Sequence, residues 1–152
     1  MGQRKPLCLY LAARRDPFMK PTILVIEDNE KNTYLVTFIL EKYGYQVIHA
    51  RDGETGIALA GRIKPDLILL DIQLPVMDGY AVARKLTGNG ELRSIPIVAV
   101  TSYAMPGDRE RILDAGCVGY IEKPINPVTF VAEIEQYLPA EKKGNGLERG
   151  RP

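Results

Sequence analysis

The sequence predicts an α/β fold in which five successive strand–helix units surround one parallel sheet. Short apolar runs alternate five times with segments whose apolar residues recur at helical spacing. The runs are rich in β-branched residues and nearly continuous, which is typical of parallel strands buried on both faces. A chain of 152 residues has room for one such doubly wound domain with a full core.

Capping residues bound the first two units. Asp28 or Asn29 can cap the first helix, and Gly44 ends it. Asp52 opens the second helix, which closes before Pro65. The predicted strands span 22–27 and 45–50, and the predicted helices run from about 29 to 43 and from about 52 to 63.

The last three units repeat this pattern. The loop after the third strand contains Pro75 and Gly79, and the helix that follows stops at Gly88. Pro106 opens the fourth helix and Pro127 the fifth. The strands are predicted over 67–71, 97–100 and 118–121, and the helices over about 78–86, 106–115 and 127–138.

Four of these strands end in charged or hydroxyl side chains. Asp71 closes the apolar run of the third strand, and an unpaired buried charge is costly unless it is exposed, paired or bound to a metal. The other strand-end residues are Glu27, Asp28, Thr101 and Lys123. Open parallel sheets bind their ligands beyond the carboxyl ends of the strands. We therefore expect these five side chains to converge on one site.

Three of the five are carboxylates, which would repel one another without a nearby positive charge. Mg²⁺ resolves this repulsion, because it prefers carboxylates, carbonyl oxygens and water, and it commonly bridges to phosphate. The predicted ligands are the side chains of Glu27, Asp28 and Asp71 and the backbone carbonyl of Gln73.

The remaining two groups suit a phosphoryl group. Lys123 offers a point positive charge to a phosphoryl oxygen, and the Thr101 hydroxyl can donate a hydrogen bond to it. A carboxylate nucleophile beside a metal can then accept phosphate as an acyl phosphate. Asp71 is the best candidate for this nucleophile, since it lies on the central strand with a loop after it.

With these residues in order, the chain resembles the receiver domain of two-component response regulators. The resemblance covers residues from about 21 to 138 and implies a flavodoxin-like (βα)5 fold with strand order 2-1-3-4-5. The separations also fit the family: 43 residues from 28 to 71, 30 from 71 to 101 and 22 from 101 to 123. The motif residues are Glu27-Asp28, Asp71 with Pro75 and Gly79, Thr101, and Lys123-Pro124, with glutamate at 27 where aspartate is common.

The resemblance implies that Asp71 takes a phosphoryl group from a histidine of a sensor kinase or a phosphotransfer protein, with Mg²⁺ required. Thr101 and Tyr120 match the two switch positions of the family, which respond when the phosphate arrives. The peptide bond before Pro124 is expected to be cis, which can aim Lys123 at the site.

The resemblance also implies which residues control loss of the phosphate and which surface binds a downstream partner. Gln73 and Tyr103 match positions that tune hydrolysis of the phosphate, and a bulky Tyr103 is expected to shield it from water. The family presents its output on the fourth helix, fifth strand and fifth helix, here residues 106–138, and a dimer that forms on phosphorylation is a further output. In detail the sequence looks most like stand-alone regulators of the cell-cycle DivK type and the receivers of hybrid kinases.

Two other functions stay open. A magnesium-dependent phosphatase or phosphotransferase of the haloacid dehalogenase kind also forms an aspartyl phosphate, but it needs a second aspartate where this chain has Gln73. A phosphate-independent protein-binding module would not need the complete set of polar residues. We therefore expect a phosphoacceptor with at most slow autodephosphorylation rather than an enzyme.

Composition agrees with an ordinary globular protein. A net charge of +1 offers no argument for binding nucleic acid or membranes, and no apolar run approaches the roughly 20 residues that span a bilayer. Cys8 and Cys117 lack metal-ligand spacing, which suits a reducing cytoplasm. We expect a flexible N-terminal extension over 1–20, a receiver domain over 21–139, and a disordered tail over 140–152 that is too short for a DNA-binding domain.

Overall fold

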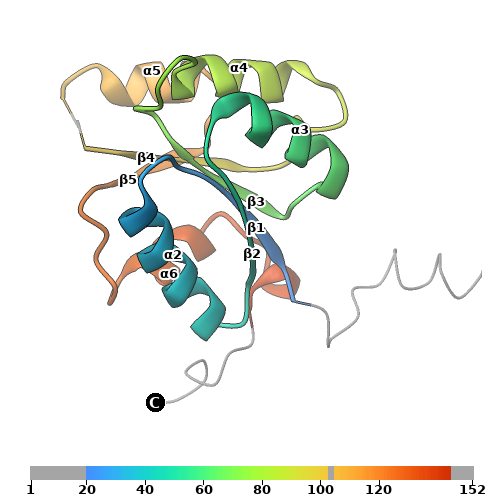
Figure 1. The fold of residues 1–152 in the computed structure, drawn as a ribbon, viewed down its shortest axis with the longest axis vertical. Helices are drawn as coiled ribbons and strands as arrows, with labels where there is room; N and C mark the ends of the chain where they lie inside the picture. The colour runs from blue at the N-terminus through green and yellow to red at the C-terminus, as the bar shows by residue number, and fades with distance from the viewer. Residues whose placement is uncertain (1–19, 103–104, 145–152) are drawn as a thin grey trace, which may run out of the picture.

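Five parallel strands form the central sheet of the protein (Figure 1). The structure is a computed structural model that describes residues 20–102 and 105–144. The strands are β1 (Thr22–Ile26), β2 (Gln46–Ala50), β3 (Leu67–Asp71), β4 (Ile97–Thr101) and β5 (Gly119–Glu122). Their order is β2-β1-β3-β4-β5, which confirms the predicted flavodoxin-like topology.

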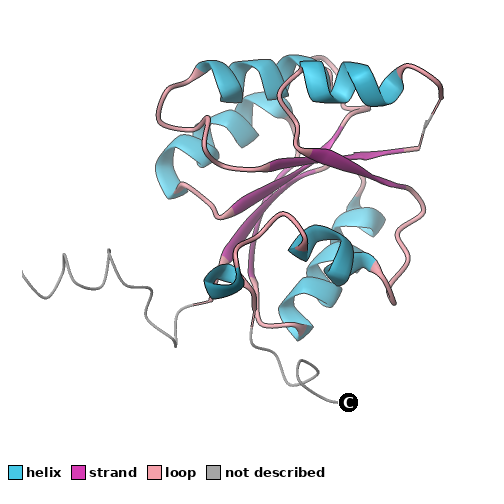
Figure 2. Cartoon of the chain, turned by 180° about the vertical axis from the view of Figure 1, so that it is seen from behind, coloured by secondary structure: helices cyan, strands magenta, loops and turns pink. Residues whose placement is uncertain are grey.

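Helices cover both faces of this sheet (Figures 1 and 2). In the described ranges they are α2 (Glu30–Lys42), α3 (Gly53–Ile63), α4 (Gly79–Gly88), α5 (Asp108–Asp114) and α6 (Phe130–Glu135). The core under α3, α4 and α5 contains Ile68 and Leu70, whereas the core under α2 and α6 contains Leu67 and Leu69. Alternate residues of β3 thus pack into the cores on opposite faces of the sheet, which explains why the strand is apolar up to Asp71.

Polar side chains cap three of the helices at their N-termini. Each accepts a hydrogen bond from a backbone N–H three residues further on: Asn29 for α2, Asp52 for α3 and Asp78 for α4. The last helix is shorter than the predicted span of 127–138. The residues before it form a turn in which Asn126 Oδ1 accepts from the Val128 N–H, so the helix begins only at Phe130.

Regular structure continues past residue 139, into the segment for which the composition predicted a disordered tail. A short 3₁₀ helix, η1, spans Ala140–Lys142. Lys142 Nζ lies 3.5 Å from Asp66 Oδ1, and Asp66 Oδ2 accepts from the Thr22 N–H at 2.8 Å. The beginning of that segment is therefore tied to the start of β1. The predicted extension up to residue 19 and the tail from 145 lie outside the described residues.

Candidate functional site

Strand register brings four strand ends to one edge of the sheet. β3 lies between β1 and β4, and β4 pairs with β5. Glu27 follows β1, Asp71 ends β3 and Thr101 ends β4. The Lys123 N–H donates to the Thr101 carbonyl at 2.8 Å, which continues the strand pairing past the end of β5. Residues that are far apart in the sequence thus meet at a single edge.

Lys123 contacts two buried carboxylates at this edge. Its Nζ lies 3.1 Å from Glu27 Oε1 and 3.4 Å from Asp71 Oδ2. Glu27 is 5% exposed and Asp71 is 3% exposed, so both carboxylates have lost most of their hydration. Because a buried charge without a partner is expensive, the ammonium group offsets part of the cost of keeping two acids at this depth.

Asp28 completes an acidic cluster with the same two residues. Ligand oxygens of Glu27, Asp28 and Asp71 all lie within 4.8 Å of one another, and Asp28 is the exposed member. Hard carboxylate oxygens at this spacing, open to water on one side, are the donor set that Mg²⁺ prefers. The residues present therefore fit a magnesium ion.

Burial and the neighbouring charges of the cluster change the pKa of Glu27. The pKa of Glu27 is raised from 4.5 to about 7, first by burial and then by the hydrogen bond and the negative charge of Asp71. The Asn29 N–H, which donates to Glu27 Oε2 at 3.2 Å, and the charge of Lys123 act in the opposite direction. Without a metal, Glu27 thus takes up a proton near neutral pH.

This raised pKa predicts a pH-dependent stability for the metal-free protein. The folded protein binds a proton at Glu27 that the unfolded chain has lost, so the free energy of unfolding should fall as pH rises from about 4.5 to about 7. We expect Glu27→Gln to remove this loss, which is on the order of 1–3 kcal/mol. Urea unfolding in EDTA at pH 5 and at pH 8 measures the difference in the free energy of unfolding between the two pH values.

The control is Glu54→Gln, which neutralises an exposed carboxylate on α3. It should leave the difference between the two pH values as it is in the wild type. An equal pH response in Glu27→Gln and the wild type would show that Glu27 is not the titrating group.

The loop after β3 shapes the surroundings of Asp71. The Gln73 N–H donates to Asp71 Oδ1 at 2.9 Å, and Asp78 caps α4. The Gly79 N–H donates to the Ile72 carbonyl at 2.9 Å, which folds the start of α4 back onto the strand. One carboxylate oxygen of Asp71 is therefore held by the loop and the other by Lys123.

The other predicted site residues lie in three settings. Thr101 is buried at the end of β4, next to the acids in the strand order. Tyr120 lies on β5, half-buried against the core under α3, α4 and α5. The peptide bond between Lys123 and Pro124 is cis. Tyr103 lies outside the described residues.

Sequence reasoning missed two residues that contact the acidic segment. His49 lies half-buried on β2, and its Nε2 is 2.7 Å from the Glu27 carbonyl oxygen. Thr33 Oγ1 donates to the Asn29 carbonyl at 3.1 Å. Neither belongs to a motif. The signal that could have found His49 is its place near the carboxyl end of the strand that pairs with β1.

Comparison with known proteins identifies the family of this chain. The family model for the response regulator receiver domain matches residues 23–135. The polar-differentiation response regulator DivK of Brucella anthropi is 45% identical over 120 residues, which make up 79% of this chain and 98% of that protein.

Solved structures show the same fold. The chemotaxis protein CheY4 of Vibrio cholerae has a TM-score of 0.76 at 26% identity, over 79% of this chain and all of that one. The receiver domain of the Pseudomonas aeruginosa sensor histidine kinase PA1611 has a TM-score of 0.72 at 34% identity, over 78% of this chain and 98% of that one. That structure contains a magnesium ion coordinated in the active site cleft. With the family model and DivK matching along the folded chain, this protein belongs to the response regulator receiver domains of two-component systems.

Proposed function

We propose that Asp71 is the phosphoacceptor of this receiver and that Glu27, Asp28 and Asp71 hold its Mg²⁺, with the Gln73 carbonyl as a further ligand. The observation that carries the proposal is the contact of Lys123 with buried Asp71 and Glu27, beside the exposed Asp28. This arrangement gathers a nucleophile, a cation and a metal-ligand set at one sheet edge.

In this proposal Asp71 attacks the phosphorus of a donor phosphohistidine. A bond forms between a carboxylate oxygen and phosphorus while the bond from phosphorus to the histidine nitrogen breaks. Bound Mg²⁺ would neutralise charge on the phosphoryl oxygens. Lys123, whose Nζ lies 3.4 Å from Asp71 Oδ2, would stabilise the same oxygens, and Thr101 and Tyr120 are the residues that respond to the new group.

Gln73 separates this function from that of a phosphatase. Receivers are phosphoacceptors and signal transducers rather than enzymes in the usual sense. A haloacid dehalogenase would need a carboxylic acid two residues after Asp71 to protonate the leaving group, and an amide cannot do so. We propose that water removes the phosphate only slowly, at a rate tuned by Gln73 and Tyr103.

The partners follow from the family and from the exposed surface. Receivers interact with histidine kinases or phosphotransfer proteins, and we propose one of these as the phosphodonor. For the output we propose the surface of α5, β5 and α6, where Leu113 and Val118 are exposed apolar residues. A downstream protein or a second copy of the phosphorylated chain would bind there.

The location is part of the same proposal. In the part of the chain that the structure describes, no helix is long and apolar enough to cross a membrane. Because the proposed phosphodonors act in the cytoplasm, we place the protein there.

The test is incubation with acetyl phosphate and Mg²⁺, followed by intact mass measurement of the wild type and Asp71→Asn. We expect one phosphate adduct on the wild type, none on the variant, and none with EDTA. Steady turnover of phosphate esters would instead favour the phosphatase. A wild type without an adduct, with either acetyl phosphate or a phosphorylated histidine donor, would favour a protein-binding module.

A further inference from the structure

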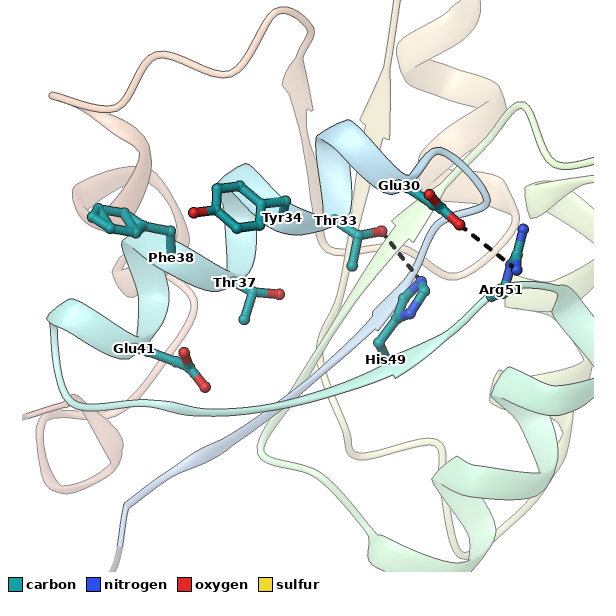
Figure 3. A pocket seen from close by; sticks show the side chains of 8 residues that line it. All are labelled: Glu30, Thr33, Tyr34, Thr37, Phe38, Glu41, His49 and Arg51. Atoms are coloured by element: carbon teal, nitrogen blue, oxygen red, sulfur yellow. Dashed lines mark hydrogen bonds and ion pairs between the residues drawn. The ribbon is translucent and has the colours of Figure 1, made fainter.

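A histidine on the neighbouring strand contacts the backbone of the acidic segment Glu27–Asn29. His49 Nε2 lies 2.7 Å from the Glu27 carbonyl oxygen and 3.2 Å from Thr33 Oγ1. Figure 3 shows the side chains of His49 and Thr33 pointing toward each other from β2 and α2. These contacts come from outside the metal-ligand set.

Hydrogen-bond chemistry decides which atoms donate. A carbonyl oxygen only accepts, so Nε2 of His49 carries the hydrogen and donates to the Glu27 carbonyl. The Thr33 hydroxyl donates to the Asn29 carbonyl at 3.1 Å, which leaves its oxygen free to share the His49 N–H. The two carbonyls that flank Asp28 therefore each accept a hydrogen bond from a side chain outside the segment.

This anchoring matters because the segment lies beyond regular strand pairing. β1 ends at Ile26, and the Glu27 N–H makes one more bond, to the Ala50 carbonyl at 3.0 Å. With His49 holding the carbonyl, both the backbone N–H and the backbone carbonyl of Glu27 are hydrogen-bonded to β2. Asp28, which is exposed, follows directly in the chain.

We propose that His49 is a positioning residue for the metal site, acting through the Glu27 carbonyl and supported by Thr33. Groups that orient metal ligands typically change metal affinity 10- to 100-fold when they are removed. This inference rests on the proposed Mg²⁺ site and adds that the affinity of that site depends on a hydrogen-bond donor from β2.

The test compares His49→Leu with His49→Gln by calorimetric titration of the full chain with MgCl₂. Leucine fills the space without a donor, whereas the glutamine amide N–H can reach the position of Nε2–H. We expect His49→Leu to weaken Mg²⁺ binding about tenfold and His49→Gln to restore most of it. Phosphorylation by acetyl phosphate should need correspondingly more Mg²⁺ in His49→Leu but reach the same rate at saturation.

A merely structural role would give a different pattern. If both variants lost affinity equally, or neither did, the proposal would be wrong. Thermal unfolding in EDTA shows whether His49→Leu is folded, and if it is not, Thr33→Val takes its place and should also weaken Mg²⁺ binding. Absence of Mg²⁺ binding by the wild type, by contrast, would overturn the proposed metal site itself.

Discussion

Replacing Lys123 by methionine should slow phosphorylation of Asp71 by acetyl phosphate about 100- to 1000-fold, which is the usual cost of losing one preorganised group that stabilises a transition-state charge. Methionine keeps most of the length of the lysine side chain but not its charge. The phosphoryl oxygens then lose the ammonium group that now lies 3.4 Å from Asp71 Oδ2. Initial rates of adduct formation at saturating Mg²⁺, followed by intact mass, measure the effect.

The matched control is Lys85→Met, which removes the same charge from the exposed surface of α4. It should leave the phosphorylation rate unchanged. In the metal-free protein, Lys123→Met should also lower stability at pH 8, because Glu27 and Asp71 then face each other without a cation. A rate within threefold of the wild type would contradict the proposed role of Lys123.

Replacing Gly79 by alanine should destabilise the protein by about 3 kcal/mol or more. A Cβ atom built at Gly79 would lie 2.5 Å from the Ile72 Cα and 2.7 Å from the Asp71 carbonyl oxygen. Both neighbours are backbone atoms of β3 and the loop that follows it, so they cannot move aside as a side chain would. Because the displaced backbone carries Asp71, the variant should also accept phosphate more slowly.

Gly61→Ala is the control for this substitution. Gly61 lies in α3, and a Cβ atom there would meet nothing within 4 Å. Alanine should therefore stabilise the helix by about 0.5–1 kcal/mol. Urea unfolding of both variants at one pH separates the effect of the clash from the general effect of a glycine-to-alanine change. Equal stability of the two variants would show that the start of α4 does not constrain β3.

Much of the fold and the core of the site could be predicted from the sequence because they follow from simple rules. Five apolar runs in alternation with helical patterns imply a parallel sheet, and the carboxyl ends of its strands meet at one edge. Asp71, Glu27 and Lys123 each follow an apolar run, so their convergence needed no knowledge of side-chain contacts. The caps of α2 and α3 were predictable for a similar reason, since capping is local in sequence.

The features that were missed depend on contacts between distant segments. Nothing near His49 in the sequence indicates that its ring reaches the Glu27 carbonyl, because that contact exists only once β2 has paired with β1. The charged, glycine-rich composition after residue 139 likewise predicts a tail, and the ion pair of Lys142 with Asp66 is formed only in the folded chain. The raised pKa of Glu27 also follows from burial, which a sequence pattern does not measure.

The lysine that contacts both buried acids directly follows β5, the last strand of the described residues. When β1 and β3 have left the ribosome, Glu27 and Asp71 can meet, but Lys123 is still missing. Repulsion between the two acids then opposes closure of the sheet at this edge until β5 docks or a divalent ion binds. Docking of β5 therefore completes the sheet and the proposed phosphorylation site together, and we predict that a nascent or truncated chain that lacks β5 would not accept phosphate.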